Sequence, residues 1–240
     1  HLLQRETDLR KAIEENQFVT YYQPIVHLET AALVGFEVLI RWQHPSLGIM
    51  YPNSFISIAE ETGLIVPLGR WVLETAARQL SAWNFPDLPL RMAVNVSPRQ
   101  LMETDFIDIV DQAVTRAGIR HADLELEITE RQVVEHMAEV EQTLRTLTGR
   151  GVRIAIDDFG TGYSSLSYLK RFPIDALKID RSFIIDSMRS KGDREIIKTI
   201  LANIIGNRPF NGSFNHSGPG GNTGFRHTAG ISHTQNRLVG

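Results

Sequence analysis

The sequence contains no cysteine in its 240 residues. This absence excludes a disulfide framework, and it excludes a thiolate as a nucleophile or metal ligand. It is compatible with a reducing compartment, so we expect a cytoplasmic domain.

An excess of positive charge is also missing, because 25 Lys and Arg residues stand against 28 Asp and Glu residues, a net charge of −3. Proteins that bind nucleic-acid polymers along their phosphates usually carry a basic field. We therefore expect no nucleic-acid polymer as a partner.

Long apolar segments are absent too. No uninterrupted apolar run approaches the roughly 18 to 20 residues that a membrane span needs, and no signal peptide is visible. We expect no membrane span in this chain. The first residue is His1 rather than Met, which suggests that the natural protein extends upstream.

What is present is enough apolar sequence, 42% of the residues, for one full core at a length typical of an α/β barrel. Residues 6–17 have helical spacing, with Leu9, Ala12 and Ile13 on one face, and we expect residues 1–17 to be a connector helix. Strands predicted over 18–26 and 33–40 are joined so briefly that they should be antiparallel.

Helices are expected next over 52–61, ended by Gly63, and over 68–83. Strands and helices then alternate. The predicted strands cover 90–96, 123–128, 152–156 and 176–179, and the helices cover 105–117, 134–148, 165–171 and 194–202. This order predicts parallel strands with right-handed crossovers.

Two adjacent carboxylates, Asp157 and Asp158, end the apolar strand predicted over 152–156. Buried neighbouring carboxylates are costly unless a cation offsets them, and oxygen ligands favour Mg²⁺, Mn²⁺ or Ca²⁺. Alternatively, the pair caps the following helix or starts a turn.

Polar residues recur at or near the ends of the other predicted strands: Glu37, Asn95, Glu127 and Lys178. Each of them alone suits a structural role. Because the carboxyl ends of barrel strands meet on one face, where active sites assemble, the whole set favours a metal site.

The motifs in which these residues stand resemble those of the EAL-type cyclic di-GMP phosphodiesterases. The resemblance runs from about residue 8 to 202, through Tyr22-Gln23-Pro24-Ile25, Glu37-Val38-Leu39-Ile40-Arg41-Trp42, Asn95-Val96-Ser97, Glu125-Leu126-Glu127-Ile128-Thr129-Glu130, Asp157-Asp158-Phe159-Gly160-Thr161-Gly162 and Lys178-Ile179-Asp180. It implies a (β/α)₈ TIM-type barrel with one antiparallel strand, covering residues 18–202.

The resemblance also implies roles in the hydrolysis of cyclic di-GMP to linear pGpG in bacterial signalling. Glu37, Asn95, Glu127 and Asp157 would hold one Mg²⁺ or Mn²⁺, and Asp157 and Asp158 would serve a second. Lys178 would orient or activate the attacking water, while Gln23, Leu39 and Arg41 would contact the dinucleotide. The loop of Phe159, Gly160, Thr161 and Gly162 would couple metal occupancy to an interface, and a sensory or GGDEF-type domain would precede the barrel.

The character of the sequence changes after Ala202. Residues 203–240 are rich in Gly and Asn, contain no Asp, Glu or Lys, and keep neither strand nor helix periodicity. This composition predicts a disordered tail, so the barrel should have six of its eight strands. The exposed strand edges would then cause poor solubility or association with another chain, a homodimer included.

The family's glutamate motif after the seventh strand and its glutamine near the eighth are also missing from this tail. The sequence therefore leaves three interpretations open: a phosphodiesterase with impaired activity, an inactive cyclic di-GMP-binding module, and a fragment without function.

Overall fold

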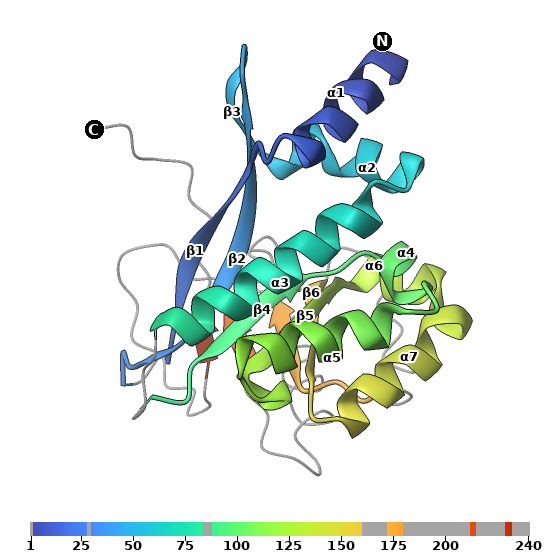
Figure 1. The fold of residues 1–240 in the computed structure, drawn as a ribbon. Helices are drawn as coiled ribbons and strands as arrows, with labels where there is room; N and C mark the ends of the chain where they lie inside the picture. The colour runs from blue at the N-terminus through green and yellow to red at the C-terminus, as the bar shows by residue number, and fades with distance from the viewer. Residues whose placement is uncertain are drawn as a thin grey trace, which may run out of the picture.

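The computed structural model describes residues 2–27, 30–83, 88–159, 172–179, 212–214 and 229–231. In this part of the chain, helices and strands alternate after an N-terminal helix and hairpin (Figure 1). The first elements are α1 (Leu2–Glu14), β1 (Phe18–His27), β2 (Leu33–His44), β3 (Gly48–Met50), a 3₁₀ turn (Pro52–Ser54), α2 (Ile56–Thr62) and α3 (Ile65–Trp83). They are followed by β4 (Arg91–Asn95), α4 (Pro98–Leu101), α5 (Phe106–Ala117), a second 3₁₀ turn (His121–Asp123), β5 (Leu124–Thr129), α6 (Glu130–Glu135), α7 (Met137–Gly149), β6 (Arg153–Phe159), β7 (Ala176–Ile179), β8 (Gly212–Phe214) and β9 (Ala229–Ile231).

These strands form one nine-stranded sheet in the order β1-β9-β8-β7-β6-β5-β4-β2-β3, and β1 also pairs with β2. The pairs from β2 through β4 to β9 are parallel, whereas β1 is antiparallel to both β2 and β9. The pairings therefore lead from β1 around the sheet and back to β1. A TIM-type α/β fold with one antiparallel strand, as the sequence predicted, has this topology.

The C-terminal region corrects one expectation. The sequence predicted that the last two strands would be missing, but β8 and β9 lie within 203–240, where β8 pairs with β7 and β9 pairs with β1. Strands of three residues are held by backbone hydrogen bonds and do not require alternating apolar and polar side chains. The amino-acid composition of the tail therefore gives no signal for them. Unpaired strand edges thus no longer argue for association with a second chain. The rest of the tail lies outside the described residues, as do the helices predicted over 165–171 and 194–202.

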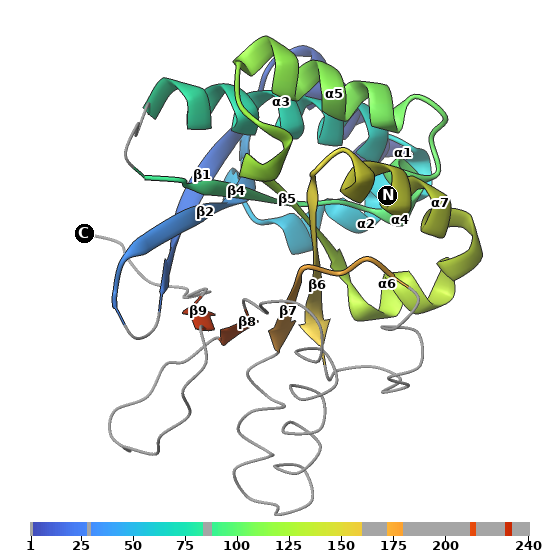
Figure 2. The same ribbon diagram turned by 90° about the horizontal axis from the view of Figure 1, so that it is seen from below.

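Two groups of buried apolar side chains hold the described elements together. The larger lies between the parallel strands and helices α3, α5 and α7, which cover them in Figures 1 and 2. The smaller joins α1 and α2 to the hairpin through Leu9, Ala12, Phe18, Trp42 and Phe55. The helix predicted over 6–17 is α1, and its buried face includes Leu9 and Ala12 as expected.

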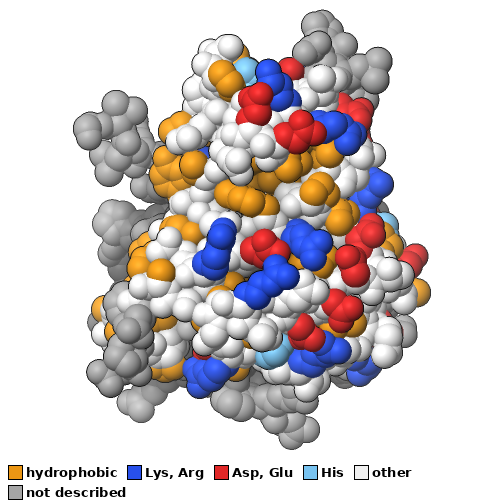
Figure 3. Space-filling model, viewed as in Figure 1, with side chains coloured by type: hydrophobic (Ala, Val, Ile, Leu, Met, Phe, Trp, Pro, Cys, Tyr) orange, Lys and Arg blue, Asp and Glu red, His pale blue; other side chains and the backbone are white. Residues whose placement is uncertain are grey.

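The surface in Figure 3 carries Lys and Arg side chains mixed with Asp and Glu side chains, so no field of one sign covers this face. This agrees with the balanced charge of the sequence. None of the described helices combines the length and apolar character that a membrane span requires.

Gly35 sets how closely β2 approaches β4, because it lies opposite Arg91 in their parallel ladder. A Cβ atom on Gly35 would lie 2.5 Å from the Arg91 carbonyl oxygen, a backbone atom that cannot turn away. We expect Gly35→Ala to lower the free energy of unfolding by about 1–3 kcal/mol, measured by urea denaturation. Gly149→Ala is the control, because a Cβ atom there meets nothing within 4 Å. Equal stabilities of the two variants would contradict the close approach.

Candidate metal-binding active site

Three carboxylates from three strands converge at one edge of the sheet. Glu37 of β2, Glu127 of β5 and Asp157 of β6 each offer an oxygen atom, and these three atoms lie within 4.8 Å of one another. The ladders produce this convergence, because Asn95 of β4 pairs with Glu127, and Thr129 of β5 pairs with Asp157. Each pairing places residues near the carboxyl ends of parallel strands, the edge where barrel enzymes carry their active sites.

The cluster is shielded from solvent. Glu127 is 1% exposed and Glu37 is 7% exposed, while Asp157 is partly buried. Burial raises the pKa of Glu127 well above its ordinary value, and the Lys178 ammonium opposes this shift. A buried carboxylate among others of the same charge stays ionised only with a cation beside it, and otherwise takes up a proton.

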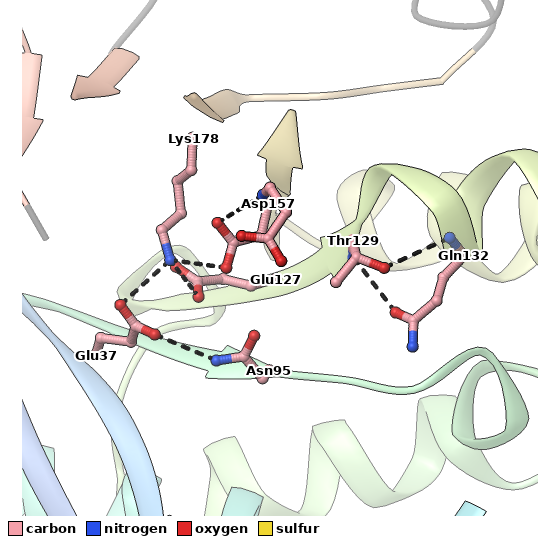
Figure 4. Close-up of polar contacts among 8 residues, drawn as sticks. Glu37, Asn95, Glu127, Thr129, Gln132, Asp157 and Lys178 are labelled. Carbon is pink, nitrogen blue, oxygen red and sulfur yellow. Dashed lines mark hydrogen bonds and ion pairs between the residues drawn. The ribbon is translucent and has the colours of Figure 1, made fainter. Parts of the chain in front are cut away.

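Lys178 of β7 supplies such a cation (Figure 4). Its Nζ atom donates to Glu127 Oε2 at 2.8 Å, to Asp157 Oδ2 at 3.1 Å and to Glu37 Oε2 at 3.2 Å. Although burial lowers the pKa of Lys178, the three carboxylates more than reverse this and hold that pKa well above its ordinary value. Lys178 therefore stands in this structure as an ammonium, a donor rather than a base.

Asn95 and Asp158 lie beside this cluster. The Asn95 amide donates to Glu37 Oε1 at 3.3 Å from the exposed end of β4. Asp158 is exposed, and its backbone N–H donates to Asp157 Oδ1 at 2.9 Å. With φ at 53°, Asp158 occupies the left-handed region, a conformation that costs non-glycine residues of order 1 kcal/mol and is often kept at functional sites.

Two buried polar atoms of this region lack a hydrogen-bond partner in the described part of the chain: Glu127 Oε1 and Gln23 Nε2. Gln23 lies directly opposite Glu37 in the β1–β2 ladder, so both side chains belong to the same face of the sheet. An orphaned buried acceptor suits a cation, and an orphaned buried donor suits an oxygen of a ligand. The carboxylate and amide donor set fits a hard divalent ion, as the sequence predicted.

Leu39 and Arg41 continue the face of β2 that carries Glu37. The Arg41 guanidinium lies 4.7 Å from the ring centroid of Tyr51 and 5.6 Å from that of Tyr21. Both tyrosines are about half exposed, so this cation is held between aromatic rings at the surface. Val38, between Glu37 and Leu39, packs into the main core.

Some residues around the site were missed in the sequence. Tyr21 could have been found two positions before Gln23 on the same strand face, whereas Tyr51 depends on the fold of the β2–β3 hairpin. Ser97 with Gln100 and Thr129 with Gln132 form capping boxes that start helices just after Asn95 and Glu127. The S/T-x-x-Q spacing of these two pairs was a readable signal.

The remaining predicted site residues form the loop after Asp157. Phe159 ends β6 and is buried, while Gly160, Thr161 and Gly162 lie outside the described residues. The structure thus brings Glu37, Glu127, Asp157 and Lys178 into direct contact, with Asn95 and Asp158 at the edge. It places Gln23, Leu39 and Arg41 on the same face of the β1–β2 hairpin as Glu37.

A carboxylate cluster near the carboxyl ends of parallel strands is the kind of site at which barrel enzymes hold metal ions. The model of the EAL domain family matches residues 6–205 of this chain. The chain therefore belongs to the EAL domain family.

Individual relatives agree with this assignment. The chain is 42% identical over 201 residues to the cyclic di-GMP phosphodiesterase NbdA of Pseudomonas aeruginosa, covering 83% of this chain and 26% of that protein. It is also 42% identical over 201 residues to the bifunctional diguanylate cyclase/cyclic di-GMP phosphodiesterase MucR of the same species, covering 83% of this chain and 29% of MucR. The chain thus spans less than a third of the length of these relatives.

A solved structure, the PaMucR phosphodiesterase in complex with c-di-GMP, superposes with a TM-score of 0.79 at 38% identity. The superposition covers 90% of this chain and 87% of the PaMucR chain. The likeness therefore extends over nearly the whole of both chains.

Proposed function

We propose that this chain hydrolyses cyclic di-GMP to linear pGpG with the help of divalent metal ions. The observation that carries the proposal is the cluster of Glu37, Glu127 and Asp157 at the carboxyl ends of the strands. The relatives named as cyclic di-GMP phosphodiesterases and the structure of one of them with c-di-GMP support the choice of substrate.

Glu37, Asn95, Glu127 and Asp157 would hold one Mg²⁺ or Mn²⁺, and Asp157 with Asp158 would hold another. When bound, such ions polarise the phosphodiester and lower the pKa of a water molecule toward neutrality. A water oxygen would add to phosphorus while the bond from phosphorus to the 3′ oxygen breaks. The attacking water would give up a proton, the leaving 3′ oxygen would take one up and become the 3′ hydroxyl, and linear pGpG with a 5′ phosphate would result.

The residues of the hairpin would bind the dinucleotide. The unpaired Gln23 Nε2 donor is buried beside the carboxylates, where it can donate to an oxygen of the substrate. Arg41 would contact a phosphate of the dinucleotide with its planar guanidinium. Leu39 would make an apolar contact with the dinucleotide. Lys178, beside these carboxylates on β7, would orient or activate the attacking water.

A second candidate is a module that binds cyclic di-GMP without turnover. The observation that favours it is the composition of residues 203–240, which lack acidic residues and hence the glutamate motif expected after the seventh strand. The loop of Phe159 to Gly162 would couple metal occupancy to an interface in either case.

Incubation of the purified 240-residue chain with cyclic di-GMP and Mn²⁺, followed by chromatographic detection of pGpG, tests the proposal. Glu37→Ala is the control. Product that disappears in the control supports hydrolysis. A folded chain that binds cyclic di-GMP but releases no pGpG would support the second candidate, the binding module. A chain that does not fold would support the interpretation as a fragment without function.

Arg41→Ala should weaken the affinity for cyclic di-GMP by roughly 10- to 100-fold, the range of a charge-assisted hydrogen bond to phosphate. The affinity is measured by titration calorimetry, or as KM where the chain turns over. Arg10→Ala is the control, because Arg10 is exposed on α1 and pairs with Glu6 one turn away on the same helix. Affinity unchanged by Arg41→Ala would rule out the phosphate contact.

Within a longer protein, we propose that α1 connects the barrel, residues 18–202 with strands β8 and β9, to an upstream sensory or GGDEF-type domain. The bifunctional name of MucR supports this arrangement. A homodimer and a cytoplasmic location remain predictions from the sequence. Light scattering of the purified chain would measure its oligomeric state.

A further inference from the structure

The Lys178 side chain makes hydrogen bonds to all three carboxylates of the cluster. An ammonium has three N–H donors, and the three hydrogen bonds to Glu37, Glu127 and Asp157 use all of them. In this arrangement Lys178 has no donor left for a water molecule or a phosphate. The role proposed for it in orienting water therefore requires at least one of these bonds to be given up.

The same three carboxylates are the candidate metal ligands. When all three are ionised, they and Lys178 carry three negative charges and one positive charge, a net charge of −2. Lys178 is 6% exposed and Glu127 is 1% exposed, which leaves little solvent to screen the charges. The ammonium and a divalent ion would therefore bind the same three buried carboxylates, and two cations so close together repel each other.

We propose that Lys178 is an internal counter-ion that competes with the divalent metal ion for Glu37, Glu127 and Asp157. This inference rests on the metal site of the proposed function and adds an order of events to it. Without metal, Lys178 holds the three carboxylates together against their mutual repulsion. Metal binding releases Lys178 from them and frees its N–H groups to donate to the attacking water or to a phosphate oxygen.

Lys178→Met tests this competition, because Met keeps the length and apolar stem of the side chain without its charge. We expect the affinity of Lys178→Met for Mn²⁺ to exceed that of the unmodified chain by about 10-fold or more, measured by titration calorimetry at one fixed pH. Lys11→Met is the matched control, since Lys11 lies exposed on α1 and pairs with Glu15. It should leave the Mn²⁺ affinity unchanged.

Thermal unfolding gives a second measurement. Lys178→Met should have a lower melting temperature than the unmodified chain in EDTA, and saturating Mn²⁺ should remove most of that difference. Mn²⁺ affinity equal to or weaker than that of the unmodified chain would overturn the proposal, because Lys178 would then support metal binding instead of opposing it.

If Lys178→Met does not fold in EDTA, the double variant Lys178→Met/Glu127→Gln decides the question. It restores the net charge of −2, since Glu37 and Asp157 then remain as the charged members. It should recover stability in EDTA, and failure to do so would show that the lost charge was not the cause. None of these measurements uses the nucleotide. A chain that behaves as expected here but makes no pGpG would overturn the proposed function and leave the counter-ion role intact.

Discussion

Glu127→Gln should reduce pGpG formation by roughly 10³-fold or more, equivalent to about 4 kcal/mol of transition-state stabilisation. Glu127 is the most buried of the three clustered carboxylates, and its unpartnered Oε1 atom is the oxygen best suited to a cation. A neutral amide keeps the shape of the side chain and removes the charge that the ion needs. The measurement is the initial rate of product release with saturating Mn²⁺.

The fold should tolerate this change. Burial already raises the pKa of Glu127, so a neutral side chain is not out of place there, and Lys178 keeps Glu37 and Asp157 as partners. We expect an unchanged circular dichroism spectrum. A loss of activity that accompanies unfolding would leave the metal role unsupported.

Glu125→Gln is the matched control, because Glu125 lies two residues earlier on the same face of β5 and is also buried. Its partners are Arg153 at 3.2 Å and Arg91 at 3.9 Å, away from the carboxylate cluster. Glu125→Gln should cost about 1–3 kcal/mol of stability, because two guanidinium groups lose their shared counter-ion. Its rate should stay within about threefold of the unmodified chain, and a loss matching that of Glu127→Gln would show that burial rather than metal binding matters.

Removal of divalent metal should abolish hydrolysis altogether. After treatment with EDTA and dialysis, we expect pGpG formation to fall to the background of the uncatalysed reaction, and Mg²⁺ or Mn²⁺ should restore it. The reason is that the proposed mechanism depends on divalent ions to polarise the phosphodiester and to lower the pKa of the attacking water. Hydrolysis that survives exhaustive removal of metal would contradict the proposed mechanism.

The same treatment should leave the chain folded, because the Lys178 ammonium remains in contact with all three carboxylates. Circular dichroism before and after EDTA checks this expectation. The contrast between lost activity and retained fold separates a catalytic metal from a structural one.

The sequence by itself determined which strands carry the polar side chains of the site. Strand and helix periods are local properties, so the places of Glu37, Asn95, Glu127 and Asp157 on four different strands could be read from the chain. The ends of the strands could not, since β2 continues past Glu37 to His44 and β6 continues past Asp157 to Phe159. The order of strands and helices then fixes the parallel sheet, because crossovers are right-handed and short. The family motifs added the expected substrate.

The tertiary structure alone decided how those side chains meet. The contact of Lys178 with three carboxylates depends on the register of four strands, and registers follow from packing across the whole sheet. The contact of Arg41 with Tyr51 depends on the fold of the β2–β3 hairpin. The direction in which Asp158 points depends on its left-handed backbone conformation. Strands β8 and β9 belong to the same category, because a ladder of backbone hydrogen bonds can form wherever a neighbouring edge is available, and no side-chain pattern announces it.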